Sequence, residues 1–482
     1  MTYDTASRRS RTATQLARTS HAMGSGLIAG HLVACRGLPC VCLFVLAVLP
    51  CLVSLPSCGP STNFDRPLTV VVSGDTDGWL VPCGCTSNQS GGLPRRGRYV
   101  ADLRVGEEVI LADVGGAAAG TSPYDRLKFE AILRGERAMG AVVHNLGASE
   151  LALGAAELSR LAKDTGVAWL SANVSEPSGR SFGTPLVALT AAGRRVALVG
   201  VVSERFATAE FRVAPPRPAV LDALRGSAER FDAVVVLAYL PEEELRQLAE
   251  TLPEVDVIVG GPTGQPLPPV RVGPVLLTSA TRQGKFLVRC TAPAVRGGSW
   301  SARIDELDER FADQEEQLAN LTRFRQILQR LDLAATETSF AEGPHGEVPE
   351  DFRVAGTSLC RDCHPAADRV WAMSAHAHAW RSLEPTAANV DPACQRCHVT
   401  GYGRPGGFVS LGRSADRVDV GCECCHGPSA GHVRSPNTRT AYHGQSRDHC
   451  AGCHDRENSP AFDYDTYWEK IRHAGEPGDG KG

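Results

Sequence analysis

The chain has 482 residues, which is enough for two or three domains. It carries 50 Lys and Arg against 54 Asp and Glu, a formal net charge of −4 at pH 7, with no basic stripe. This balance excludes the electrostatic surface of a nucleic-acid-binding protein, so no nucleic-acid partner is expected. Its 17 cysteines would be reactive liabilities as free thiols outside the cytosol, which indicates that a cofactor uses many of them.

The sequence pattern of residues 1–58 predicts an export signal. Residues 38–55 read LPCVCLFVLAVLPCLVSL, an uncharged run that follows Arg36. The run ends in LPSC, which resembles a bacterial lipobox and implies cleavage before Cys58 and lipidation of that thiol. An uncleaved membrane anchor of marginal length is the alternative. Either interpretation predicts a protein that lies on the periplasmic or cell-surface side, held at the membrane by a lipid anchor or by the uncleaved segment.

Residues 65–298 alternate β-branched runs with amphipathic helical patterns. The pattern predicts buried strands at 68–72, 109–112, 195–202, 232–239 and 255–261. Helices are expected between them, for example at 155–165 and 241–253. Strands that alternate with helices in this way predict a layered α/β domain.

The motifs of this domain follow one another in a familiar order: GDTDGWLVPCGCTSNQSGGLPRRGRYVADLR, ILADVGG, NLGASE, VVVLAYLPEEE and IVGGPTGQPLPP. In this order they resemble the calcineurin-like metallophosphoesterases of the 5′-nucleotidase type. The resemblance implies a site for two metal ions. In that family the ligands are an Asp-x-His pair, a bridging Asp, an Asn-His dyad, a single His and a Gly-His-x-His.

Most of these metal-ligand positions are replaced in this chain. Asp75 and Asp113 fall where the first and bridging aspartates are expected, but Asp77 stands for the first histidine. The remaining positions hold residues without a suitable donor, namely Ala148, Ser149, Tyr239, Pro262 and Gly264. Two divalent ions need several carboxylate and imidazole donors, so no dinuclear metal is expected and the domain is predicted to be a degenerate phosphoesterase. His144, the only histidine between residues 65 and 300, is predicted to be structural.

The PCGC stretch places Cys83 and Cys85 two residues apart. A mononuclear metal clamp, a redox pair and a pair of buried small residues are all compatible with it. Cysteines at this spacing rarely bridge each other, so buried small residues are favoured, with Cys290 as a candidate disulfide partner.

Residues 301–334 are predicted to form one long amphipathic linker helix. A seam with 4-3 spacing consists of Leu307, Phe311, Leu318, Leu321 and Leu328 and is interrupted by Gln314 and Arg325. Packing of this seam on one of the chain's own domains is favoured over dimerisation. Residues 335–353 then predict a flexible linker.

Residues 354–475 contain the pattern Cys-x-x-Cys-His four times. The copies are CRDCH with Cys360, Cys363 and His364, CQRCH with Cys394, Cys397 and His398, CECCH with Cys422, Cys425 and His426, and CAGCH with Cys450, Cys453 and His454. Two thiols on one turn can form thioethers with the vinyl groups of a haem, and the histidine can then reach the iron. Zinc ribbons and redox dithiols also use a CxxC pair, but they do not predict the histidine in fixed register four times. The motifs therefore predict four covalently bound haem c groups.

This segment holds ten of the fourteen histidines and few long apolar runs, so haem faces are expected to form much of its interior. A mostly α, haem-packed domain is predicted. Met373 is its only methionine, so His/Met ligation could serve at most one iron.

The ordered stretches CRDCHPAADRVWAMSAHAHAW, CQRCHVTGYGRPGG, VGCECCHGPSAGH, CAGCH and FDYDTYWEKIRH resemble the tetrahaem cytochrome c-554 family over the whole segment. The resemblance implies that His376, His432 and His473 are distal iron ligands. The haem attached through His398 would then keep an open face. His378 could compete with His376, and His443 and His449 are further candidates, although exposed polar positions are the simpler interpretation. Cys424 stands where the family has serine.

Electron transfer to and from unidentified redox partner proteins is the expected function, because closely packed haems exchange electrons without protein chemistry. An open haem would allow a second class of function, an oxidoreductase that reduces a small nitrogen or oxygen species. A metal-dependent phosphoesterase ranks third.

Overall fold

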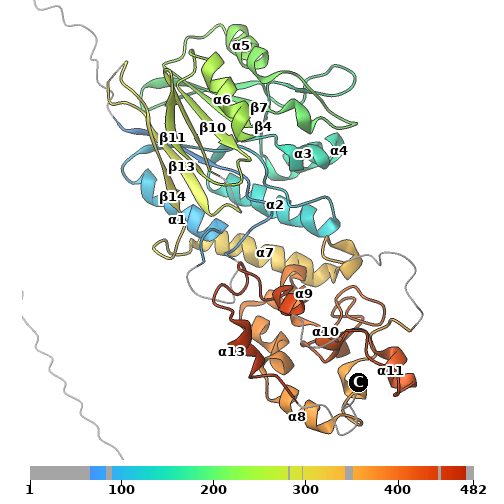
Figure 1. Ribbon diagram of the computed structural model, residues 1–482. Coiled ribbons are helices and arrows are strands. Elements are labelled where there is room, and N and C mark those ends of the chain that lie inside the picture. The colour runs from blue at the N-terminus through green and yellow to red at the C-terminus, as the bar shows by residue number, and fades with distance from the viewer. Residues whose placement is uncertain are drawn as a thin grey trace, which may run out of the picture. The chain divides into compact units, whose positions relative to one another are not determined.

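The computed structural model describes residues 66–82, 89–280, 283–295, 297–341, 351–442 and 447–473 (Figure 1). The export signal with Cys58, the PCGC cysteines Cys83 and Cys85, and His443 lie outside these ranges. Within them, no helix combines the length and the apolar character that a membrane span requires.

Two six-stranded sheets form the first domain. The strand order of the first sheet is β14 (Ser301–Glu306), β13 (Phe286–Thr291), β1 (Leu68–Ser73), β2 (Glu108–Asp113), β3 (Ala141–Asn145) and β4 (Trp169–Leu170). The second runs β11 (Leu267–Val272), β12 (Val275–Ser279), β10 (Val257–Gly261), β9 (Ala233–Tyr239), β7 (Arg194–Val202) and β6 (Leu186–Ala191). A small pair joins β5 (Val174–Ser175) to β8 (Arg212–Val213). The predicted layered α/β domain, including its five strands, is confirmed.

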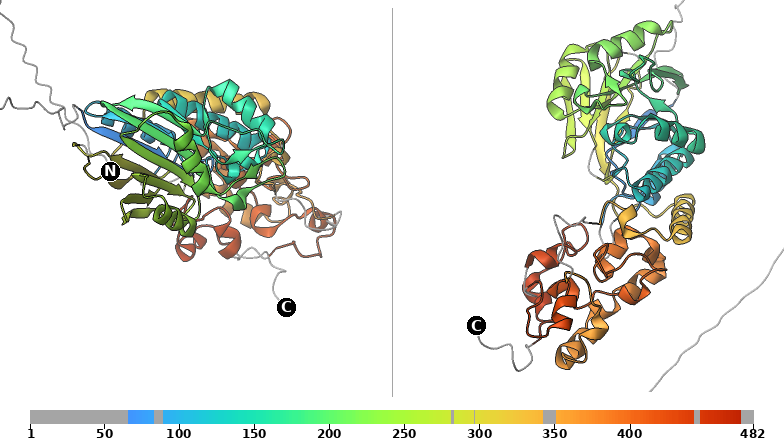
Figure 2. Two further views of the ribbon diagram at one scale, coloured as in Figure 1. Left: turned by 90° about the horizontal axis from the view of Figure 1, so that it is seen from above. Right: turned by 90° about the vertical axis from the view of Figure 1, so that its right-hand side faces the viewer.

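The two sheets pack face to face, and helices cover their outer sides (Figures 1 and 2). Successive side chains of a strand point to opposite faces of the sheet, and in β1 both faces are apolar. Val70 and Val72 belong to the core between the sheets, whereas Val71 belongs to the core beneath the helices. The helices are α1 (Leu93–Arg104), α2 (Pro123–Ala138), α3 (Ala148–Ala152), α4 (Ala155–Thr165), α5 (Pro216–Gly226) and α6 (Glu242–Thr251). Both predicted helices are confirmed, and α4 has the predicted bounds.

The predicted linker helix from residue 301 is wrong in its first part. Residues 301–306 form the edge strand β14, which pairs with β13 in antiparallel register, and helix α7 (Glu315–Leu331) begins only after them. Alternating side chains such as Ile304 pack on the sheet core, which a helical reading of the apolar spacing overlooked.

Helix α7 packs on the first domain, as favoured. Leu321 and Leu328 of the predicted seam join the core beneath α1 and α2, but Leu318 is 41% exposed and Phe324 is buried in its place. Asn320 donates to the Ala131 carbonyl of α2 at 2.8 Å. The predicted flexible linker is only partly described, since residues 342–350 lie outside the described ranges. Its first part is ordered: Ala335 is buried and donates its backbone N–H to the Val409 carbonyl at 2.8 Å.

The C-terminal segment consists of short helices joined by turns. They are α8 (Pro365–Ala372), α9 (Pro392–His398), α10 (Glu423–His426), α11 (Ala430–Arg434), α12 (Arg447–Ala451) and α13 (Tyr464–Trp468). Its own apolar core is small: Trp380, Val399 and Phe408 form the one cluster of fully buried apolar residues found in the described part of this segment. The polypeptide alone therefore buries little apolar surface here.

Candidate functional site

Three pairs of imidazole rings lie close together in the C-terminal segment, at interplanar angles of 27°, 46° and 65°. In each pair, one ring belongs to a CxxCH motif and the other comes from elsewhere in the chain. His364 faces His432 with ring centroids 6.0 Å apart, and His454 faces His376 at 6.1 Å. His426 faces His473 at 5.9 Å. The structure thus brings together all three histidines that the resemblance implied as distal ligands with three of the four motif histidines.

The separation of these rings fits a metal ion between them. An imidazole nitrogen lies about 2 Å from a bound transition metal, and the ring centroid lies about 1 Å further, so two axial imidazoles have centroids about 6 Å apart. Other aromatic pairs also lie at this separation, such as Trp380 and Phe408 at 6.0 Å, so the distinguishing feature is that each pair joins one motif histidine to one other histidine. The three pairs therefore fit the axial ligands of haem irons.

His398, the histidine of the second motif, is different. Among the described residues, no second imidazole makes a ring contact with it. Its Nδ1 lies 2.7 Å from the Ala379 carbonyl oxygen and donates to it, which orients the ring and leaves Nε2 as the ligand atom. His432 is oriented in the same way, since its Nδ1 lies 2.7 Å from the Thr438 carbonyl.

Burial favours the neutral form of several of these imidazoles. It lowers the pKa of His376, His426 and His454, with neighbouring histidines as a second cause. A neutral imidazole is the form that binds a metal. Among the other candidates, His449 lies against the ring of Tyr442 at 4.9 Å instead of against an imidazole.

The cysteines of the four motifs are free thiols and lie in two groups. The side chain of Cys360 lies beside that of Cys422, so the first motif adjoins the third, and the side chain of Cys397 lies beside that of Cys453, so the second adjoins the fourth. Cys424 is separate from them: its Sγ lies 3.5 Å from the Val399 carbonyl, and burial raises its pKa to about 11. This pairing of motifs could not be predicted from local patterns, because it depends on how the short helices fold back on one another.

The phosphoesterase-like positions lie at the carboxyl ends of the strands of the first domain. Burial and the neighbouring Asp75 raise the pKa of Asp77 to about 6. A side chain at position 116 would lie 2.9 Å from the Asp75 carboxylate and would also contact Tyr239, but that residue is glycine. Opposite Asp75, therefore, stands Gly116 and not Asp113, which corrects the placement expected from the sequence.

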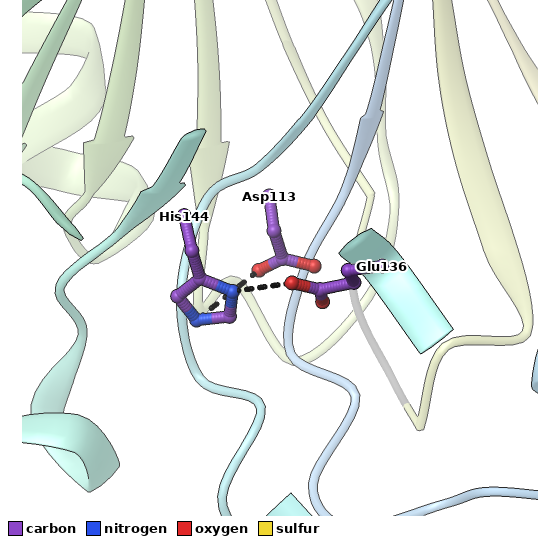
Figure 3. A group of neighbouring side chains, drawn as sticks. All are labelled: Asp113, Glu136 and His144. Carbon is purple, nitrogen blue, oxygen red and sulfur yellow. Dashed lines mark hydrogen bonds and ion pairs between the residues drawn. The ribbon is translucent and has the colours of Figure 1, made fainter. Parts of the chain in front are cut away.

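Asp113 instead belongs to a buried ionic network with Glu136 and His144 (Figure 3). His144 Nδ1 hydrogen-bonds Glu136 at 2.8 Å, and its Nε2 lies 3.9 Å from Asp113. The guanidinium of Arg96 lies 3.9 Å from both carboxylates. Although burial alone would lower the pKa of His144, Glu136 and Asp113 hold it well above its usual value. Because an arginine and a histidine supply the positive charge, we interpret this cluster as a structural network, as predicted for His144.

Replacing Arg96 by methionine is expected to destabilise the first domain by about 3–5 kcal/mol, since Asp113 and Glu136 would lose a buried counter-charge. Denaturant unfolding measures this change. Arg98→Met is the matched control, because Arg98 lies on the same helix and its pair with Asp102 is about half exposed on both sides. The control substitution should lower the free energy of unfolding by less than about 1 kcal/mol. Equal losses in the two variants would contradict the role of the network.

Within the described ranges Cys290 is a free and fully buried thiol in β13, and its candidate disulfide partners Cys83 and Cys85 lie outside those ranges. Its side chain lies in the core between the sheets, where it packs as a small apolar group.

Comparison with known proteins gives a family match within the C-terminal segment. Residues 359–427 match the family described as cytochrome c554 and c-prime. Cytochrome c-554 of Nitrosomonas europaea is 37% identical over 93 residues, which are 16% of this chain and 40% of that protein. The chain thus spans less than half of this relative's length. The predicted resemblance of this segment to the cytochrome c-554 family is confirmed for the matched residues.

Solved structures similar to this chain include a sulfate thiohydrolase from Thermus thermophilus, with a TM-score of 0.48 and 18% identity over 55% of this chain and 61% of that one. A 5′-nucleotidase precursor from Thermus thermophilus has a TM-score of 0.47 and 22% identity over 55% and 59% of the two chains. A calcineurin-like phosphoesterase from Bacillus subtilis has a TM-score of 0.46 and 17% identity over 54% and 97%.

Proposed function

We propose that this chain is an extracytoplasmic electron-transfer protein with four covalently bound haem c groups. The observation that carries the proposal is the set of three imidazole pairs, each joining a CxxCH histidine to a distant one at 5.9–6.1 Å. Cytochrome c-like sequence over residues 359–427 supports it independently. Bound haem supplies one-electron redox chemistry, while the protein supplies ligation, spacing and a low dielectric constant.

The roles of the residues follow from the motifs and pairs. The eight CxxCH cysteines attach the haems, and the four motif histidines are the proximal ligands. His432, His376 and His473 are the distal ligands opposite His364, His454 and His426. Bis-imidazole ligation favours a lower potential than His/Met ligation. Lipidation of Cys58 would hold the protein at the membrane surface, where it would meet redox partner proteins.

The mass of the mature chain tests the haem count. Haem attached through thioethers stays bound under denaturing conditions, so the mass should exceed that of the processed polypeptide by four haems, and haem staining after denaturing electrophoresis should be positive. A mass increment of fewer haems, or bound zinc in place of iron, would overturn the proposal.

A second candidate function is reduction of a small nitrogen or oxygen species at the second haem. It is favoured by His398, which makes no ring contact with another imidazole among the described residues. An open sixth position would let a small ligand reach that iron. Turnover of nitric oxide, hydroxylamine or peroxide by the reduced protein tests this candidate. An open site without turnover would contradict it and leave electron transfer as the only proposed function.

The first domain is not expected to hydrolyse phosphate esters. Gly116 and Tyr239 stand beside Asp75 where further ligands would be needed, and Tyr239 is buried. Phosphatase and nucleotidase assays of the full chain with manganese, zinc and magnesium should show no metal-dependent turnover. Turnover that Asp75→Ala abolishes would contradict this prediction.

A further inference from the structure

The helix of the second CxxCH motif packs against the first domain. Helix α9 carries Cys394, Cys397 and His398, and its residue Ala393 packs on the core beneath α1 and α2. Its residues Pro392 and Gln395 also line one small pocket together with Leu328 of α7. Figures 1 and 2 both show α9 beside α7. The motif that holds the proposed open haem is therefore the one whose helix joins the first domain's core.

A hydrogen bond connects the two parts at the start of this helix. Tyr124 of α2 is fully buried, and its hydroxyl donates to the Asp391 carboxylate at 2.5 Å. The same oxygen of Asp391 accepts the backbone N–H of Ala393 at 3.0 Å and so caps α9. The phenol of Tyr124 in the first domain is thus connected, through the Asp391 carboxylate, to the first turn of the helix that carries the second motif.

Aromatic side chains hold this connection in place. The ring of Tyr124 lies 5.7 Å from that of Phe340 and 6.4 Å from that of Phe324 on α7. Phe340 in turn lies under the guanidinium of Arg396 at 4.9 Å. Arg396 stands between the two cysteines of the second motif. The aromatic side chains around Tyr124 therefore also contact a residue of the motif itself.

The fourth motif also touches the first domain, but differently. Glu457, three residues after His454, forms an ion pair with Lys285 that remains partly exposed. The Tyr124 phenol is fully buried, so its hydroxyl must find an acceptor inside the protein, whereas both groups of the Lys285–Glu457 pair keep some contact with water that screens their attraction. The Tyr124 contact is therefore the stronger constraint.

We propose that Tyr124 is a positioning residue for the second haem, and that the phosphoesterase-like domain serves as the scaffold that fixes this haem. The inference rests on the proposed function, since it takes haem at the second motif as given. Tyr124 acts through Asp391, because the hydrogen bond that the phenol donates partly offsets the negative charge of this carboxylate beside the second motif. A chain without the first domain would hold α9 less rigidly and leave the carboxylate less neutralised.

The test replaces Tyr124 by phenylalanine in the full, haem-loaded protein. Asp391 would keep its charge with one donor fewer, which favours the ferric state, so the midpoint potential of one haem should fall. Hydrogen-bond partners beyond the ligands typically change site properties by about tenfold or more, so we expect about a tenfold change in the one-electron equilibrium constant. Tenfold corresponds to about 59 mV. Asp391→Asn keeps a capping side chain but removes the charge, so it should shift the same haem in the opposite direction.

Tyr99→Phe is the matched control. Tyr99 is also buried in the first domain and donates its hydroxyl to an aspartate, Asp305, but it lies on α1 and its partner on the edge strand β14. It should leave every haem potential unchanged. Equal potentials in the wild type, Tyr124→Phe and Asp391→Asn would overturn the proposal, and so would an equal shift in Tyr99→Phe.

Carbon monoxide binding separates this inference from the proposed function. If the wild type binds carbon monoxide, the shifted haem should be the one that binds it, and a shift at another haem would overturn the inference. If the wild type binds none, the open face at His398 is wrong, and the redox titrations of the three variants still decide whether Tyr124 positions a haem.

Discussion

Replacing His473 by alanine is expected to convert one low-spin haem into a high-spin haem. The ring of His473 faces that of His426 at 5.9 Å, and Ala at this position removes the only imidazole that faces the third motif among the described residues. The third iron would then be five-coordinate. Electron paramagnetic resonance of the oxidised protein should show two high-spin irons where the wild type shows one, and the reduced variant should bind two molecules of carbon monoxide.

His449→Ala is the control for this experiment. His449 packs on Tyr442 and faces no motif histidine, so its removal should leave the spin states unchanged. A His473 variant with the spectrum of the wild type would show that the ring pair seen in the structure is not an axial pair. His432→Ala should reproduce the effect of His473→Ala at the first haem, since His432 faces His364 at 6.0 Å.

Loss of the haems is expected to unfold the C-terminal segment while the first domain stays folded. The described part of the segment buries one small apolar cluster of three residues, whereas the first domain has three large clusters. Without haem the segment lacks the apolar contacts that offset the entropy of ordering its chain. The variant that tests this replaces all eight attaching cysteines by alanine, at positions 360, 363, 394, 397, 422, 425, 450 and 453.

Amide hydrogen exchange measures both halves of this variant at once. Residues 351–473 should exchange at nearly the rate of an unfolded chain, and β1, β2 and β9 should keep the protection of the wild type. Control substitution of the half-buried Cys424, which belongs to no CxxCH pair, should leave the haem content intact. Strong protection of α8 and α11 in the haem-free variant would contradict the dependence of the segment on haem.

Much of the fold could be predicted because periodicity reports burial. The runs that became β1, β7 and β9 are continuous apolar stretches, and such stretches are typical of strands covered on both faces. Residues 301–306 were mistaken for helix because SARIDE is short, half-exposed and of low apolar content. Residues 301–306 form a strand because they pair with β13, and this pairing leaves no pattern in the sequence of residues 301–306 from which it could be predicted.

The attaching residues of the C-terminal segment follow from a local motif, so the sequence was sufficient to predict them. The choice of partner for each distal histidine depends on folding of short helices over long separations, for example 68 residues between His364 and His432. In the first domain, Asp113 follows the motif order of a metal ligand, but its side chain points into the buried network with Arg96 and His144. The direction of one side chain at the end of a strand cannot be deduced from motif order alone.

The ratio of bound carbon monoxide to haem tests the central claim most directly. Pyridine haemochrome gives the haem content, and titration of the fully reduced protein with carbon monoxide gives the number of open irons. Three imidazole pairs, together with His398 of the second motif, which has no imidazole partner within the described ranges, predict four haems and one bound carbon monoxide per chain. Two or more molecules of carbon monoxide per chain, or a haem count other than four, would contradict the account.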